Sequence, residues 1–103
     1  MAITKFQQKV YALCRKIPRG NVTTYREIGN ALGGKGQIYR AVGVALNKNP
    51  LAPEVPCHRV VNCGGFVGGF AHGTKNKIAL LKKEGVEIIN NKVDLKRFLF
   101  LFS

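Results

Sequence analysis

The sequence predicts a small, mainly helical domain with a helix-turn-helix of the winged-helix-like kind and at most a short β element. Three observations support this fold class. The chain has 103 residues, 46% of them apolar, which suits one domain with one core. Four segments repeat apolar residues at helical spacing. Prolines and glycines gather in residues 50–73, so three helical segments precede this stretch and one follows it.

The first predicted helix opens with a capping box. Thr4 and Gln7 have the spacing at which each side chain accepts a hydrogen bond from the other residue's backbone amide. The apolar residues that follow share one stripe: Phe6, Val10, Leu13, Cys14 and Ile17. Because Cys14 lies on that stripe, we expect it in the core. Pro18 and Gly20 end the helix.

A second and a third helix form the predicted helix-turn-helix. Thr24 and Glu27 repeat the capping-box spacing, and the glycine turn 33–36 separates this helix from a third one over residues 37–46. Their apolar positions are Ile28, Ala31, Leu32, Ile38, Ala41, Val42, Ala45 and Leu46. Two short helices joined by a glycine turn are typical of DNA-binding motifs, although helical hairpins without that function share the pattern.

The middle of the chain is punctuated by proline and glycine. Asn49-Pro50, Pro53 and Pro56 predict an extended connection, and Val60-Val61 predicts a short strand. Five glycines between residues 64 and 73 predict a tight loop that a flat ligand can approach closely.

The last third of the chain predicts one more helix and a tail. The helix is expected over Asn76–Glu84, with Gly85 as its stop. Residues 93–102 fit either a helix or a strand. Their apolar end, residues 98–102, is expected to pack on the domain rather than lie in water.

The charge balance points to a polyanionic partner. Lys and Arg total 17 and Asp and Glu total 5, a formal net charge of +12. Residues 1–50 hold nine of the basic residues and one acidic residue, so the predicted helix-turn-helix lies in the more basic half. We expect nucleic acid as the partner, ahead of an anionic membrane surface.

Several other classes are not favoured. The longest apolar run has five residues, whereas a bilayer span needs about 20. The N-terminus lacks a secretion signal, so a cytoplasmic, nucleoid-associated location in a prokaryote is expected, with reduced cysteines. Zinc is not expected, because there is no Cys-x-x-Cys and His58 and His72 are 14 positions apart.

The segment Pro56-Cys57-His58-Arg59 carries the most promising chemistry. A cysteine attacks as the thiolate, and a histidine or cation close by favours that form. Adjacent side chains point apart, so a water bridge from Cys57 to His58 is easier to build than a direct bond. Glu84 is a candidate to orient His58. On composition alone, the interpretation of Cys57 as a small buried apolar residue beside a surface histidine is favoured over catalysis.

The stretch Val55-Pro56-Cys57-His58-Arg59-Val60 closely resembles the active-site motif of the O6-alkylguanine-DNA alkyltransferases. The resemblance covers residues 4–88. Upstream matches in order are Ile17-Pro18-x-Gly20, Thr24-Tyr25-x-Glu27-Ile28, Arg40-Ala41-Val42-Gly43 and Asn49-Pro50. Downstream matches are Gly65-x-Val67-Gly68-Gly69-Phe70-x-x-Gly73, Lys77, Leu80-Leu81 and Glu84-Gly85.

This resemblance implies a repair reaction that each molecule performs once. Cys57 takes the alkyl group from O6 of guanine, and the resulting thioether is stable in water. His58 deprotonates Cys57 through a water and Glu84 polarises His58. Asn49 holds the local backbone and the thiol network, and Tyr25 donates a proton or hydrogen bond to N3 of the leaving purine. No cofactor and no metal are implied.

The resemblance also implies how duplex DNA containing O6-alkylguanine is bound. The target base is flipped out, and Arg40 fills the gap it leaves. The helix that carries Arg40 lies in the minor groove, and its contacting face is formed by Tyr39, Arg40, Ala41, Gly43 and Val44. The residues implied to form the guanine pocket are Leu46, Val60, Gly68, Gly69, Phe70 and Ala71. The alternative interpretations without DNA contact are that Arg40 is a solvated charge on the helix and that Gly43 only weakens the helix locally. One copy of the chain suffices, so a monomer is expected.

Three residues depart from the family pattern, which has tyrosine at Phe70, a small residue at Tyr39 and often glycine at Val44. The family's common N-terminal domain is not expected here, so residues 1–103 are interpreted as a single catalytic and DNA-binding domain. Two other functions stay open. One is an alkyltransferase-like protein that binds alkylated guanine for other repair, although such relatives typically carry tryptophan in place of the cysteine and this chain has no Trp. The other is a Cys–His hydrolase.

Overall fold

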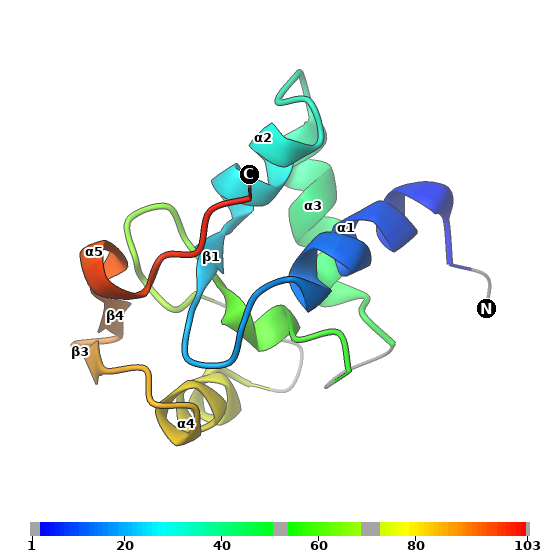
Figure 1. Cartoon of the computed structure of the whole chain (residues 1–103). Coiled ribbons are helices and arrows are strands. Elements are labelled where there is room, and N and C mark those ends of the chain that lie inside the picture. Colours follow the sequence, from blue (N-terminus) through cyan, green and yellow to red (C-terminus); the bar gives the residue numbers. More distant parts are fainter. Residues whose placement is uncertain (1–2, 51–53, 69–72, 103) are drawn as a thin grey trace.

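The computed structural model describes residues 3–50, 54–68 and 73–102. The predicted mainly helical fold class is confirmed (Figure 1). The elements in chain order are α1 (Lys5–Arg15), β1 (Thr23–Thr24), α2 (Tyr25–Ala31), α3 (Ile38–Asn47), the 3₁₀ turn η1 (Cys57–Arg59), β2 (Val60–Val61), α4 (Thr74–Lys83), β3 (Ile88–Ile89), β4 (Lys92–Val93) and α5 (Leu95–Phe98).

Helix α1 begins as its sequence predicts. Both hydrogen bonds of the capping box form, from the Gln7 amide to Thr4 Oγ1 and from the Thr4 amide to Gln7 Oε1. Cys14 is fully buried, which confirms its expected place in the core. The Tyr11 hydroxyl donates to the backbone carbonyl of Ala45 at 2.7 Å and thereby ties α1 to α3.

Helices α2 and α3 form the predicted hairpin. Thr24 caps α2 through a hydrogen bond from the Glu27 amide. Gly33 and Gly34 adopt positive φ angles of 114° and 64°, which lets the chain reverse. The placement of Ala31 on the buried side of α2 was wrong. Ala31 is exposed at the end of the helix, and Leu32 after it packs against the core instead.

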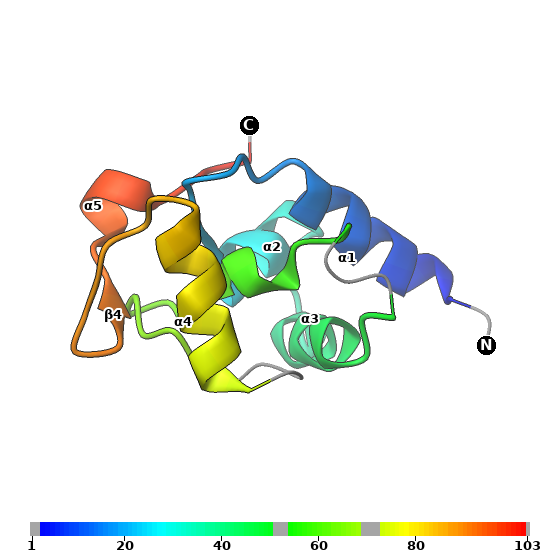
Figure 2. The same cartoon turned by 90° about the horizontal axis from the view of Figure 1, so that it is seen from below.

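The predicted strand at Val60-Val61 is confirmed, and it positions the site. It pairs in parallel with β1 in the register Thr23↔Val60 and Thr24↔Val61. Neighbouring strand residues point to opposite sides, and here Val60 enters one core while Val61 enters another. The first core joins α1, α2, α3 and η1, and the second joins β2, α4 and the C-terminal elements. Figures 1 and 2 show the two groups on opposite sides of η1.

The C-terminal half contains structure that the sequence did not predict. Helix α4 starts at Thr74, two residues before the expected start, and ends at Lys83, one residue before the expected end. Gly85 follows with a positive φ of 90°, as expected of the glycine that stops the helix. Strands β3 and β4 form an antiparallel hairpin, whose turn residues Asn90 and Asn91 have φ angles of 53° and 62°. Asparagine tolerates this left-handed region better than most residues and favours such tight hairpin turns.

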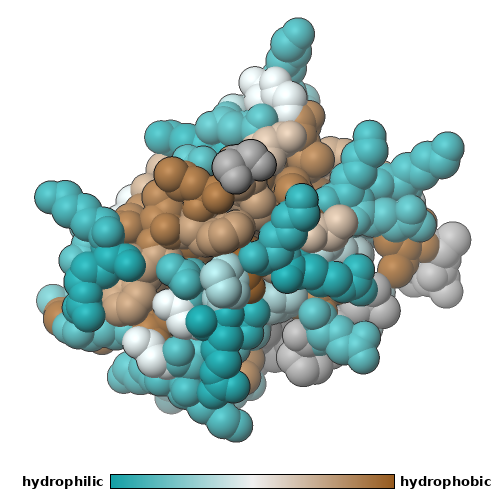
Figure 3. All heavy atoms as spheres, in the orientation of Figure 1, coloured by the Kyte–Doolittle hydropathy of each residue, from teal (hydrophilic) through white to brown (hydrophobic). Residues whose placement is uncertain are grey.

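Residues 93–102, for which the sequence fits either a helix or a strand, form both. It contributes β4, the short helix α5 and then an extended segment that bridges Leu99 to Val22 in parallel. The Phe100 amide donates to the Val22 carbonyl at 2.7 Å, and the Thr23 hydroxyl donates to the Phe100 carbonyl. The predicted packing of the apolar tail on the domain is therefore confirmed. Figure 3 shows apolar side chains gathered around this C-terminus.

Candidate active site

Cys57 opens η1, and two hydrogen bonds fix the backbone just before it. Pro56 has φ −81° and ψ 66°, the values of an inverse γ-turn, and the Cys57 amide donates to the Val55 carbonyl at 2.8 Å. The Asn49 side-chain amide donates to the same carbonyl at 2.9 Å. The expected hold of Asn49 on the local backbone is thus present. Cys57 is 6% exposed and packs in the first core.

Three polar side chains form a connected group behind Cys57. His58 Nε2 lies 3.0 Å from Glu84 Oε2, so the predicted pairing of these two residues is confirmed. The Arg59 guanidinium donates two hydrogen bonds, of 2.9 Å and 2.7 Å, to the same carboxylate. It also donates one to the Ile17 carbonyl. This bidentate contact orients the Glu84 carboxylate, and the carboxylate in turn orients the His58 imidazole ring.

Electrostatics define the protonation of this group. Burial raises the pKa of Glu84, but the hydrogen bonds from Arg59 and His58 outweigh it and leave this pKa below its ordinary value. Burial lowers the pKa of His58, and together with the charges of Arg59 and Lys77 it outweighs the hydrogen bond and the charge of Glu84, which raise this pKa. His58 is therefore neutral at pH 7, and its Nε2 proton is donated to the ionised Glu84. The free lone pair is on Nδ1, which makes that atom the available base.

Tyr25 links the thiol region to an open cavity. Burial is the main cause that raises its pKa, and the thiols of Cys57 and Cys14 add to the shift, so the phenol is a neutral donor at pH 7. Its side chain also lines a cavity of about 510 Å³ together with Arg26, Tyr39, Asn62 and Cys63.

Residues 5–86 match the family described as "6-O-methylguanine DNA methyltransferase, DNA binding domain". The chain belongs to this methyltransferase family. It is 47% identical over 83 residues to the Methylated-DNA–protein-cysteine methyltransferase of Saccharolobus islandicus strain L.S.2.15, covering 81% of this chain and 52% of that protein. It is 40% identical over 91 residues to a Bifunctional methyltransferase/endonuclease of Picrophilus torridus, covering 88% of this chain and 30% of that protein. The chain thus spans about half of these curated relatives, or less.

Solved structures of the methyltransferase family share the fold. S. pombe Atl1, in complex with damaged DNA containing O6-carboxymethylguanine, aligns with a TM-score of 0.83 and 31% identity, over 97% of this chain and 98% of that one. Mycobacterium tuberculosis OGT in complex with DNA aligns with a TM-score of 0.75 and 42% identity, over 81% of this chain and 51% of that one.

The residues that the family resemblance assigns to DNA contact all lie on or beside the outer side of α3. Arg40 and Val44 are exposed, and Ala41 and Gly43 are partly covered. Tyr39 is 39% exposed, but its ring lies over Gly29 of α2 and its hydroxyl donates to the Asn30 side chain. The aromatic residue at this unusual position therefore also packs α3 against α2.

The predicted pocket residues divide into three groups. Leu46 and Val60 are buried in the same core as Cys57. Gly68 has a positive φ of 75°, and a Cβ there would crowd the Asn62 side chain, so glycine suits the position. Gly69, Phe70 and Ala71 lie outside the described residues.

Lys77 is a buried cation that interacts electrostatically with Cys57 and His58, and its burial was not expected from the sequence. It is fully buried on α4, and burial lowers its pKa to about 8, while the Cys57 thiol acts in the opposite direction. The charge of Lys77 also contributes to lowering the pKa of His58. A lysine in a helix rich in lysines looks like surface charge in a sequence, and the only available signal was that Lys77 belongs to the motif of the methyltransferase family.

Among residues 3–50, 54–68 and 73–102, no cluster of three or more His, Cys, Asp or Glu side chains has a metal-binding arrangement. Within the same ranges, no helix is long and apolar enough to cross a membrane.

Proposed function

We propose that this domain repairs O6-alkylguanine in duplex DNA by transferring the alkyl group to Cys57. The thiolate sulfur attacks the alkyl carbon, an S–C bond forms and the C–O6 bond breaks. The electron pair of that bond returns to the guanine, which takes up one proton. The products are guanine in DNA and an S-alkylcysteine, whose thioether has no hydrolysable bond, so each molecule acts once.

The observation that carries this proposal is the placement of Cys57 next to an oriented base. Glu84 holds His58 through Nε2, at 3.0 Å, and leaves Nδ1 to accept the thiol proton through a water. A neutral His58 is required for this step, and burial keeps it neutral. Tyr25, a neutral phenol close to the thiol region, supports proton donation to the leaving guanine.

Entry of the substrate requires base flipping, because O6 of guanine is stacked inside the duplex. The exposure of Arg40 on α3 supports the proposal that its side chain fills the gap that the base leaves. The net charge of +12 supplies attraction to any DNA sequence. One copy of the chain contains every group that the proposal uses.

A second candidate function is a binding protein that marks alkylated guanine without transferring the group. The similarity to S. pombe Atl1 over nearly the whole of both chains favours it. The two functions differ at Cys57, because a binding protein needs no nucleophile there.

Mass spectrometry after mixing with a duplex that contains O6-methylguanine separates the two. We expect a mass gain of one methyl group in place of a proton, located on Cys57 by peptide mapping. Cys57→Ala abolishes the gain, and Cys63→Ala, which removes an exposed thiol, leaves it intact. Tight binding of the duplex with no mass gain would establish the binding function instead.

A further inference from the structure

The C-terminal tail is the outer strand of a short parallel ladder. Val22 of β1 donates to the Phe98 carbonyl at 2.9 Å and accepts from the Phe100 amide at 2.7 Å, while the other edge of β1 pairs with β2. Backbone groups of successive strand residues point to opposite edges, so the amide and carbonyl of Leu101 point away from β1. Neither has a hydrogen-bond partner among the described residues. The ladder therefore ends in an open edge.

Apolar side chains surround this edge. Leu101 is 58% exposed. Phe100 and Phe102 are half-buried and pack edge to face, and they cover the first core together with Leu13 of α1. Figure 3 shows apolar side chains gathered around the C-terminus, with hydrophilic ones around them. An open strand edge beside exposed apolar side chains is a surface to which a further strand can add.

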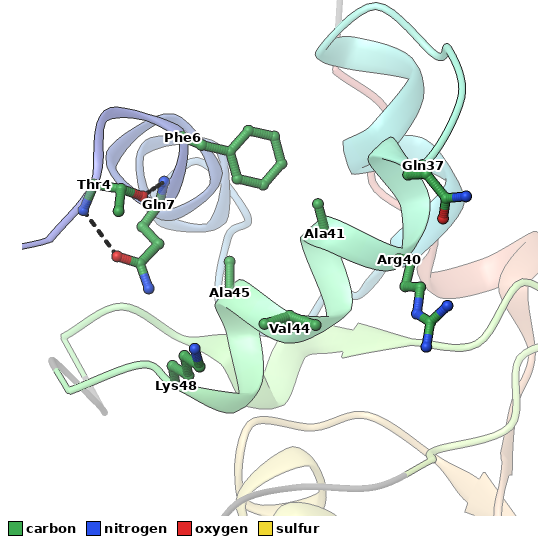
Figure 4. A pocket seen from close by; sticks show the side chains of 9 residues that line it. All are labelled: Thr4, Phe6, Gln7, Gln37, Arg40, Ala41, Val44, Ala45 and Lys48. Carbon is green, nitrogen blue, oxygen red and sulfur yellow. Dashed lines mark hydrogen bonds between the residues drawn. The ribbon is translucent and has the colours of Figure 1, made fainter.

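The tail lies away from the side of α3 that the proposed function assigns to DNA. Figure 2 shows the C-terminus and α3 at opposite edges of the molecule, with α2 between them. Figure 4 shows the outer side of α3 with Arg40 and Val44, and none of the described tail residues lines the groove drawn there. The edge therefore stays accessible while α3 contacts DNA.

Basic side chains border the apolar surface. Residues 5–22 carry five basic residues and no acidic one. Lys9 and Lys16 lie one helical turn from Leu13, on the same side of α1, and both are exposed. Lys96 is exposed on α5, directly before the tail. Charge complementarity therefore favours an occupant with acidic side chains.

The acidic residues close to α5 do not reverse this balance, because both are already bonded. Asp94 accepts from the Lys96 amide, and Glu87 pairs with Arg97 at 3.0 Å. A second copy of the chain is a poor occupant, since it would bring together two molecules of net charge +12.

We propose that the tail edge binds an extended segment of a partner protein that carries both apolar and acidic side chains. The segment adds as a further strand and pairs with the outward amide and carbonyl of Leu101. Its apolar side chains cover Leu101 and the two phenylalanines, and its acidic side chains face the bordering lysines. The inference does not depend on the proposed reaction, because it uses a face of the molecule that the reaction does not involve.

A fluorescein-labelled peptide of sequence Glu-Val-Glu-Val-Glu-Val-Glu is the probe, and fluorescence anisotropy with the whole chain measures its affinity. Leu101→Pro removes the outward N–H and no hydrogen bond of the fold, because proline is tolerated at a strand edge. We expect this variant to bind the peptide roughly tenfold more weakly or worse. Leu101→Ala is the matched control. It keeps the N–H and should weaken binding by roughly threefold or less.

Changes in the peptide test the same contact with the wild-type chain, so they decide the proposal whether or not Leu101→Pro folds. Methyl groups on every second backbone nitrogen block one edge of the peptide at a time. Methylation along one edge should abolish binding, whereas methylation along the other should leave it unchanged. A peptide with lysine in place of each glutamate should bind roughly tenfold more weakly or worse.

Three results would overturn the proposal. The first is no measurable binding of the glutamate peptide, or equal binding of the glutamate and lysine peptides. The second is equal affinity of the wild type and a folded Leu101→Pro, or equal effects of methylation along the two peptide edges. The third is a dimer in analytical ultracentrifugation that Leu101→Pro dissociates, because the occupant of the edge would then be a second copy of the chain.

Discussion

Cys14 and Cys57 share one core, yet their surroundings give them different chemistry. Burial, with a smaller contribution from the neighbouring Cys57, raises the pKa of Cys14 to about 12, so that it remains a thiol at pH 7. Cys57 is followed by His58, whose imidazole is oriented by Glu84. At the scale of single residues, the two thiols therefore differ in the polar groups that follow them in the chain.

Glu84→Gln is expected to slow methyl transfer from free O6-methylguanine roughly 10²-fold, because the amide no longer fixes the tautomer of His58. It also weakens a charge-assisted contact with Arg59, at a cost of about 2 kcal/mol in unfolding free energy. Stopped-flow transfer rates and urea unfolding measure the two effects.

Because burial lowers the pKa of His58, the acid limb of the wild-type rate should lie below pH 6.5. A wild-type rate that declines already above pH 6.5 would contradict His58 as the base.

Lys77→Met is expected to change the pH dependence of stability. The folded pKa of Lys77 is about 8 against an ordinary 10.5, so the unfolded chain binds more protons between these values. Wild-type stability therefore rises with pH across this interval, by up to about 3 kcal/mol relative to the variant. Urea unfolding of both chains at pH 7, 9 and 10.5 measures the difference. If the difference in unfolding free energy between the wild type and Lys77→Met stays constant with pH, folding does not lower the pKa of Lys77.

At the scale of elements, the packing of α2 on α3 depends on a glycine facing an aromatic ring. The Tyr39 ring occupies the space where a side chain at position 29 would lie, and its hydroxyl bonds to Asn30. This contact adds to the packing of Ile28 against Val42 and Leu46 in the first core and joins α2 to the helix that carries Arg40.

Gly29→Ala is expected to destabilise the fold by about 1–3 kcal/mol and to weaken duplex binding, because the new methyl group overlaps the Tyr39 ring. Gly43→Ala is the matched control on α3. A Cβ there meets nothing within 4 Å, so the usual helix preference for alanine should add about 0.5–1 kcal/mol. Thermal and urea unfolding compare the two. Similar stability of both variants would show that the contact between Tyr39 and Gly29 does not hold α3.

At the scale of the whole molecule, one short parallel ladder and the tail join two cores. Val60 and Val61 point into different cores, and Val22 pairs with the tail at Leu99. Phe100 and Phe102 pack edge to face against each other and against the first core. The last residues of the chain therefore stabilise the strand region that carries η1.

Deletion of residues 99–103 is expected to lower the melting temperature markedly, because it removes two half-buried aromatic rings and two hydrogen bonds of Phe100, one to the Val22 carbonyl and one from the Thr23 hydroxyl. Phe100→Ala keeps the backbone and should cost about 2 kcal/mol, whereas Leu101→Ala, at a side chain that is 58% exposed, should cost little. Calorimetry measures all three. An unchanged melting temperature after the deletion would show that the tail is not part of the cooperative unit.

Local features of the sequence predicted much of this domain. Capping residues, glycine stops and apolar stripes act within one or two helical turns, so the starts of α1 and α2 and the end of α4 could be inferred directly. The β3–β4 hairpin was missed because its strands are two residues long and its Asn90-Asn91 turn is a weaker signal than Asn-Gly. In the site, the resemblance predicted the pairing of His58 with Glu84 and the hold of Asn49 on the backbone near Cys57, and both contacts are present.

The sequence by itself determined the fold class, the family motif and the excess of positive charge, because each is a property of composition or short-range spacing. Only the tertiary structure decided which groups meet. Glu84 reaches His58 across 26 positions, Lys77 is buried on a helix that looks polar, and the tail pairs with a strand 77 residues away. Such contacts arise from the packing of distant elements around a common core, and spacing along the chain carries no record of that packing.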